Sequence, residues 1–174
     1  YYETKLYIQP YSGSTTITAG KNNIVQVTAV DGYLPTHYRN TSDLTTGLQN
    51  IAVGLNAGSG ITTGQGNISI GIESFKTNST QNNNVCVGIA TLRDNIDSTN
   101  CTAVGHQAGI VCLHGNANTF IGEGADIDNS AHTFSNSTAI GQQSKITASS
   151  QITLGTSSEY VYLPSSYVKV DGNI

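Results

Sequence analysis

The chain has 174 residues, of which only 10% are charged and 37% are hydrophobic, and its formal net charge is -4. Its seven lysines and arginines form no basic stripe that could neutralise phosphates, so we expect no nucleic acid partner. No apolar run approaches the roughly 18 residues that a membrane-spanning helix needs, so we expect no membrane insertion.

Residues 1–49 form the first of three expected units, an N-terminal β segment or cap. The stretches KLYIQP, STTITAG and NNIVQVTAV predict strands separated by Pro, Gly and Asn turns, and DGYLPTHYRN predicts an irregular loop. All nine tyrosines lie outside the repeats described next, and we expect narrow coils to exclude large rings, so that aromatic residues cap the ends. Stacking on sugar is the alternative for exposed tyrosines. In the loop we select Tyr33, His37 and Tyr38 as candidate receptor contacts.

The second unit, residues 50–158, is a repeat marked by a glycine that closes each short apolar run. These glycines are Gly54, Gly71, Gly88, Gly105, Gly122, Gly141 and Gly155. The spacings are 17, 17, 17, 17, 19 and 14 residues, and a period this short is typical of a solenoid in which each repeat is one coil. The apolar runs span about four residues between turn formers, which favours strands over helices. We therefore expect an all-β parallel β-roll with coils of about 17 residues, about 4.8 Å apart.

An aliphatic residue precedes each glycine, and a small residue follows it three positions later. The aliphatic residues are Val53, Ile70, Val87, Val104, Ile121, Ile140 and Leu154, and we expect them to be buried. The small residues are Ala57, Ser74, Thr91, Ala108, Ala125, Ser144 and Ser158. They indicate a tight corner that faces a narrow interior, where glycine supplies the backbone freedom. Asn-rich links provide the opposite turn, because Asn tolerates left-handed conformations.

The strands also carry a prediction about assembly. Successive strand residues face opposite ways, so the row that alternates with the aliphatic one is Ala52, Ser69, Cys86, Ala103, Phe120, Ala139 and Thr153. Neither row carries a charge, although one of them must lie outside. We therefore expect the outer face to be covered by other copies of the chain, in an intertwined or side-by-side homotrimer. A monomeric solenoid with one mildly apolar flank is the alternative.

The third unit, residues 159–174, continues an alternation of apolar and polar residues and predicts a strand that leads to a further domain or cap. The chain starts at Tyr1, contains no Met and has no signal-like opening. We interpret it as a fragment or a processed product.

The residue types that bind metals do not form a recognisable site. Cys86, Cys101 and Cys112 lack CxxC spacing and are expected to be buried free thiols. His106, His114 and His132 are expected at the surface, with no second ligand type at a regular offset.

The carboxylates allow one metal hypothesis. Glu123, Asp126 and Asp128 cluster in EGADID, and Asp94 lies two periods before Asp128, so oxygen ligands on one edge could hold calcium. Solvated acids on turns are the favoured interpretation, and we expect no metal and no cofactor.

The sequence also argues against enzymes and against ice binding. It shows no marked pair of carboxylates for glycoside hydrolysis, no GxSxG and no phosphate loop. An ice-binding solenoid would need a rank of Thr, and the corresponding positions are Ile51, Ile68, Val85, Thr102, Thr119, Thr138 and Ile152. Thr occupies only three of them.

The motifs NIAVG, NISIG, CTAVG, NTFIG and STAIG, each followed by a small residue, resemble the head repeats of trimeric autotransporter adhesins of the YadA type. Those heads are left-handed parallel β-rolls that assemble as trimers and bind host matrix or cell surfaces. Their usual repeat is nearer fourteen residues, which only the step from Gly141 to Gly155 matches. The seventeen-residue form is more similar to repeats in fibre and tail proteins of phages and large DNA viruses. The resemblance covers about residues 50–172.

The resemblance implies a non-enzymatic structural and adhesive module of a surface fibre, extracellular and on a virion. Its partners would be its own copies, other fibre segments and a host-surface glycan or protein. The head of a bacterial trimeric autotransporter adhesin is the alternative, followed by a monomeric ice-binding solenoid and a glycan-cleaving tailspike.

Overall fold

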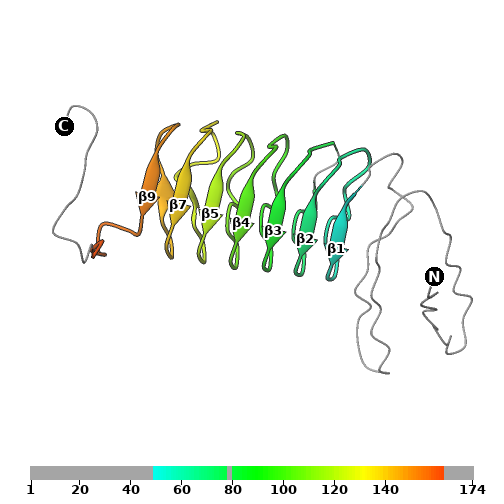
Figure 1. Cartoon of the computed structure of the whole chain (residues 1–174), viewed down its shortest axis with the longest axis horizontal. Helices are drawn as coiled ribbons and strands as arrows, with labels where there is room; N and C mark the ends of the chain where they lie inside the picture. The colour runs from blue at the N-terminus through cyan, green and yellow to red at the C-terminus, as the bar shows by residue number, and fades with distance from the viewer. Residues whose placement is uncertain (1–48, 78–79, 163–174) are drawn as a thin grey trace, which may run out of the picture.

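The computed structural model describes residues 49–77 and 80–162, and these residues wind into a parallel β-solenoid (Figure 1). Seven short strands, one from each coil, lie side by side along the rod in the order β1-β2-β3-β4-β5-β7-β9. Their bounds are Ile51–Val53 (β1), Ile68–Ile70 (β2), Val85–Val87 (β3), Thr102–Val104 (β4), Thr119–Ile121 (β5), Thr138–Ile140 (β7) and Ile152–Leu154 (β9). The expected all-β parallel fold and its 17-residue period are confirmed.

Neighbouring strands pair in the register that the glycine alignment predicts. Val53 pairs with Ile70, and every later aliphatic residue pairs with its equivalent in the next coil. A second sheet, which the alignment did not predict, joins β6 (Asp126–Ile127) to β8 (Lys145–Ile146), also in parallel. In sequence, β6 follows β5 and β8 follows β7, so each of these two coils contributes one strand to the main sheet and one to the second sheet. The second sheet forms another wall of these last coils.

The corner glycines are required by space as well as by conformation. Gly54, Gly71, Gly88, Gly105, Gly122 and Gly141 have φ between +121° and +135°, a region that residues with a Cβ rarely adopt. A Cβ at Gly105 would also lie 2.6 Å from the carbonyl oxygen of Gly122 in the next coil. The stacked backbone at these glycine corners therefore leaves no space for a side chain.

Residues with a left-handed backbone conformation form the turn before each strand, at the opposite corner of the coil from the glycines. Asn83, Asn100 and Asn136 stand directly before the buried residue that opens a coil, with φ of 57°, 58° and 58°. Asn tolerates this conformation better than most residues, which confirms the predicted role of the Asn-rich links.

A buried column of asparagines ties the coils together along the axis of the rod. The backbone N–H of Asn67 donates to Oδ1 of Asn50 at 2.9 Å, and that of Asn84 donates to Oδ1 of Asn67 at 3.0 Å. The Asn67 amide nitrogen also donates to the carbonyl of Gln81 at 2.8 Å. Each amide thus satisfies buried backbone groups of its own coil and of the next, which a buried polar side chain must do to avoid a desolvation cost.

Cys101 interrupts this column. Its Sγ accepts from the backbone N–H of Asn118 at 3.5 Å and donates to the carbonyl of Gly115 at 3.5 Å, in the places where Asn would make shorter bonds. Beyond it, Oδ1 of Asn118 accepts from the backbone N–H of Ser137 at 3.1 Å, so the column resumes in the coil of β5.

The interior is narrow but it does admit rings. Phe75 and Phe120 are fully buried among the core residues, which contradicts the expectation that the coils exclude aromatic side chains. The ring of Phe120 fits because position 109, in the preceding coil, is glycine: a methyl group there would lie 2.9 Å from Cδ2 of Phe120. The large side chain of Phe120 in one coil is therefore accommodated by a glycine, which has no side chain, in the neighbouring coil.

Candidate functional site

The outer face of the seven-stranded sheet is the candidate site, because the aliphatic row lies there and not in the core. In each strand the middle residue points inward and the other two point outward, so the small row of Ala52, Ser69 and their equivalents lines the interior. We name the aliphatic row the apolar column: Val53, Ile70, Val87, Val104, Ile121, Ile140 and Leu154. Six of its members are between 37% and 47% exposed, and Val87 is half-buried. The prediction that this row is buried is wrong for the single chain.

The reversal has a simple physical reason. Parallel coils stack about 4.8 Å apart, and the narrow interior between two walls accepts small side chains such as Ala and Ser but not a row of seven branched ones. The six small corner residues from Ala57 to Ser144 are buried as predicted, whereas Ser158, the last of that series, is exposed. The seven corner positions therefore follow the prediction until the final coil.

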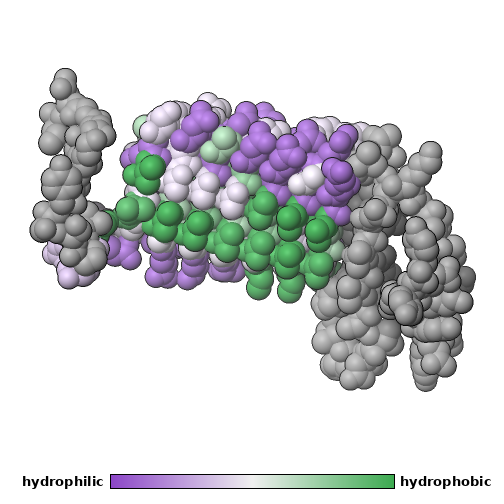
Figure 2. All heavy atoms as spheres, in the orientation of Figure 1, coloured by the Kyte–Doolittle hydropathy of each residue, from purple (hydrophilic) through white to green (hydrophobic). Residues whose placement is uncertain are grey.

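The apolar column runs the length of the rod, and Figure 2 shows it as a continuous green band. The band is wide over β1 to β3 and narrow beyond them. Two flanking columns explain this change, one at the start of each strand and one directly after each corner glycine.

Both flanking columns change character between β3 and β4. At the start of the strand stand Ile51, Ile68 and Val85, and then Thr102, Thr119 and Thr138. After the glycine stand Leu55, Ile72 and Ile89, and then His106, Glu123 and Gln142. The first three coils thus present an apolar patch three columns wide, and the next three present a single apolar column between polar ones.

The polar flank of the later coils is hydrogen-bonded within itself. Nε2 of Gln142 donates to Oε2 of Glu123 at 2.9 Å, and Nδ1 of His106 lies 3.8 Å from Oε1 of the same carboxylate. These side chains are half-exposed, so they form a wet edge along the apolar column.

The other candidate residues of the sequence do not come together as a metal site. Asp94 is held by Arg93 at 2.7 Å, and Asp128 lies 2.7 Å from Nδ1 of His132. Within residues 49–77 and 80–162, no group of three or more His, Cys, Asp or Glu side chains is placed to hold a metal ion. His114 likewise lies beside an acid, with Nδ1 at 2.8 Å from Asp97.

Asp126 corrects the interpretation of the acids as solvated. It is fully buried in β6, where its carboxylate accepts from the backbone N–H of Val111 at 2.7 Å and from its own neighbour Ile127 at 2.8 Å. Burial raises the pKa of this carboxyl to about 6, although these hydrogen bonds and Lys145 act in the opposite direction. Through its bond to Val111, Asp126 links β6 to the loop of the preceding coil.

The three cysteines are buried free thiols, as predicted. Burial raises the pKa of Cys101 to about 11 and of Cys112 to about 12, and raises that of Cys86 well above its usual range. Thiols in this state are poor nucleophiles and poor metal ligands.

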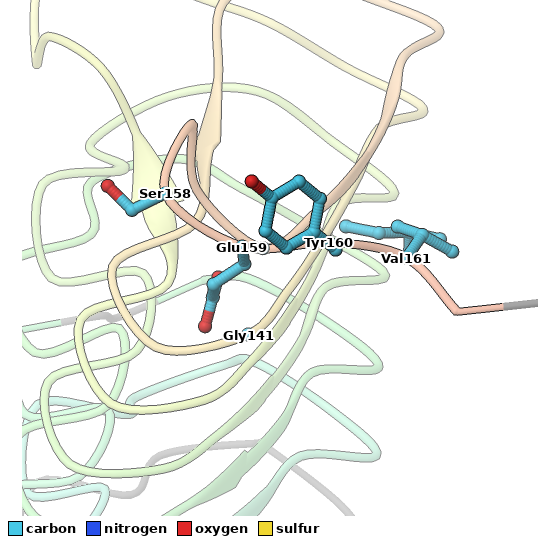
Figure 3. Close-up of a pocket in the computed structure, with 7 residues that line it drawn as sticks. Gly141, Ser158, Glu159, Tyr160 and Val161 are labelled. Carbon is cyan, nitrogen blue, oxygen red and sulfur yellow. The ribbon is translucent and has the colours of Figure 1, made fainter.

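A shallow hollow lies at the C-terminal end of the rod (Figure 3). It is lined by Gly141, Leu154, Gly155, Ser158, Glu159, Tyr160 and Val161. The Glu159 side chain turns toward Gly141, and its carboxylate accepts from the backbone N–H of Thr156 at 2.6 Å. It is the single carboxylate among these described lining residues.

The predicted receptor contacts Tyr33, His37 and Tyr38 lie outside the described residues. Two features were missed by sequence reasoning: the outward direction of the aliphatic row and the switch in its flanks. A signal for the first was present, because the alternate row is mostly Ala, Ser and Cys and therefore fits a narrow interior better.

Comparison with protein-family models, curated proteins and solved structures returns no match for this chain. No helix in the described part of the chain has the length and apolar character needed to cross a bilayer.

Proposed function

We propose that the chain is a non-enzymatic structural and adhesive module of an extracellular fibre, assembled as a homotrimer and located on a virion surface. The observation that carries this proposal is the apolar column on the outside of the rod. Soluble single chains rarely leave a long contiguous apolar surface open to water, because covering it is favourable by about 25 cal/mol per Å². A cover made of the same chain matches the column coil by coil.

The rod suits a mechanical task. Core side chains such as Phe75, Phe120 and Ile127 pack in the interior of the described coils. Hydrogen bonds between successive coils run along the sheet, as from the Gly71 N–H to the carbonyl of Val53 at 2.8 Å. Backbone that is paired in this way is not available to proteases in extended form. The fibre module would therefore hold its binding surfaces at a fixed spacing.

Adhesion follows from copy number. Three copies around one axis present three equal faces, so weak contacts to a repetitive surface add through effective concentration. The proposed contacts are those of Tyr33, His37 and Tyr38 with a host-surface glycan or protein, and further fibre segments would join at either end of the rod.

The proposal is tested by binding the purified chain to an array of animal, plant and bacterial surface glycans and to intact cells. We expect binding by the assembled protein and at least about a hundredfold weaker apparent affinity for a variant that no longer assembles. Equal affinity of both forms would contradict the multivalent mechanism. Release of reducing ends from a bound polysaccharide would overturn the non-enzymatic assignment.

A further inference from the structure

The outer face of the sheet is divided into two parts along the rod. Over β1 to β3 it consists of nine apolar residues in three columns: Ile51, Val53, Leu55, Ile68, Ile70, Ile72, Val85, Val87 and Ile89. Over β4, β5 and β7 the central apolar column continues, but Thr on one side and the polar row of His106, Glu123 and Gln142 on the other replace its neighbours. The strand register is unbroken across this boundary, since Val85 pairs with Thr102 and Val87 with Val104.

We infer that copies of this chain meet along this face with β1 to β3 as a dry seam that holds them together, and with the polar edge of β4 to β7 as the element that sets their direction. This inference rests on the proposed homotrimer and names the surface that forms it. In the resulting arrangement the copies run parallel and in register, so that each coil meets the same coil of its neighbours.

The seam belongs to a second copy because the nine-residue patch carries no charge and repeats at the coil spacing. A basic or acidic partner finds no complementary group on it. The coils of β1 to β3 carry two cations, Lys76 and Arg93, and both already pair with acids of the same chain, so they offer little to an anionic membrane surface. A second copy of the chain has the same spacing between coils, so it can place one branched side chain opposite each gap between coils over the whole length of the patch.

Direction follows from the cost of burying charge. If two copies overlapped fully in opposite directions, the coil of β2 would meet the coil of β7, and the coil of β3 would meet that of β5. Ile89 would then lie against Glu123, whose carboxylate would lose water without gaining a partner. The contacts of Glu123 with His106 and Gln142 lie within one chain and persist in either direction. In the parallel arrangement each coil meets the same coil of a neighbour, so Glu123 faces the polar Thr column of β4, β5 and β7 instead of Ile89.

A set of cysteine variants measures the direction. All three native thiols are buried and do not compete with a cysteine placed in the flanking column, at Ile72 or Gln142. A short bismaleimide, added while the copies exchange, reports which residues of different copies are close. We expect Ile72→Cys to link to itself, and Gln142→Cys to link to itself, in the folded protein. Ala131→Cys, exposed on the loop between β6 and β7, is the control that should not link.

Mixing the Ile72→Cys and Gln142→Cys variants, each with a different tag, gives the decisive comparison. The parallel arrangement keeps position 72 of one copy four strands, or roughly 19 Å, from position 142 of another, beyond the reach of the reagent. Links between position 72 of one variant and position 142 of the other, without self-links, would overturn the parallel direction. Self-linking of Ala131→Cys at the same rate would overturn the choice of face.

A pair of substitutions tests where the seam is strong. Ile70→Asp and Ile121→Asp change the same column at nearly equal exposure, 38% and 40%, so their cost to the single chain should be alike. We expect Ile70→Asp to raise the concentration at which the assembly dissociates at least about tenfold more than Ile121→Asp does. Equal or reversed effects would contradict the dry seam. If the unsubstituted chain is itself a monomer by light scattering, the homotrimer fails, whereas a stable multimer with the wrong links fails this inference alone.

Discussion

Gly109 leaves the space that the ring of Phe120 fills in the next coil. A methyl group on Gly109 would lie 2.9 Å from Cδ2 of Phe120 and 2.7 Å from Cδ2 of Leu92. Leu92, Gly109 and Phe120 belong to three successive coils. Because Gly109 has no side chain, there is room for the two large side chains on either side of it. The interior is therefore packed as a fitted whole along the axis, although each coil reads as a copy of the last.

The first prediction concerns this fit. Gly109→Ala should lower the free energy of unfolding by about 2–4 kcal/mol, because overpacking adds to the cost of a left-handed backbone at φ +66°. The matched control is Gly66→Ala, which has φ +67° and whose added methyl group would come close only to Oδ1 of Asn83, at 2.7 Å, with the rest of that residue at ordinary contact distance. Urea unfolding followed by circular dichroism measures both. Equal losses for the two variants would show that Phe120 and Leu92 do not confine position 109.

The second prediction concerns the gap in the asparagine column. Cys101→Asn should raise the free energy of unfolding by about 1 kcal/mol, since the new amide would accept from Asn118 N–H and donate to the carbonyl of Gly115. The control is Cys101→Ala, which removes the thiol without supplying an amide and should be destabilising. Thermal unfolding of both variants measures the difference. A Cys101→Asn variant no more stable than Cys101→Ala would contradict the role of the column.

The third prediction concerns pH. The pKa of Asp126 is raised to about 6 in the folded chain, so between about pH 4 and pH 6 the folded state binds more protons than the unfolded state. The contribution of this group to stability therefore falls as the pH rises through that window, by on the order of 2–3 kcal/mol.

The measurement for Asp126 is the free energy of unfolding at several pH values between 4 and 7.5, for the natural chain and for Asp126→Asn. The variant cannot titrate, so the difference between the two chains should shift against the natural chain as the pH rises. A difference that stays constant over this range would show that the carboxyl is not proton-linked. The effect of Asp126→Asn at a single pH does not test the linkage, because Asn can accept from only one of the two N–H groups.

The fourth prediction concerns the thiols. Cys86, Cys101 and Cys112 are buried and their pKa values are raised, so a thiol reagent at pH 8 should label none of them in the folded protein within minutes. In denaturant all three should react at once. Mass spectrometry counts the labels, and rapid labelling of any cysteine without denaturant would mean that its coil opens locally.

The repeat made most of the fold predictable, because its glycines and the small residues after them can occupy only one kind of corner. The period of 17 residues then sets the register without further information, as the pairing of Val53 with Ile70 illustrates. Which strand residues face inward was harder to predict. A branched aliphatic residue before a glycine is typical of a buried strand, and only the width of the interior decides that Ala52 and not Val53 faces it.

The site was less accessible to sequence reasoning than the fold. The burial of Asp126 depends on the β6–β8 wall, which replaces the turns of earlier coils and has no counterpart in the alignment of glycines. The change of flank between Ile89 and His106 is visible in the sequence, but its meaning requires knowing that both residues stand on the outer face. That placement comes from the structure.

The central claim is that the apolar column is covered by further copies of the chain, and the most direct test is the mass of the protein in solution. Light scattering under non-denaturing conditions, at several concentrations, should give three times the chain mass of 18.2 kDa, unchanged on dilution. A mass of one chain at every concentration would contradict the claim and leave the column as the open flank of a monomeric solenoid.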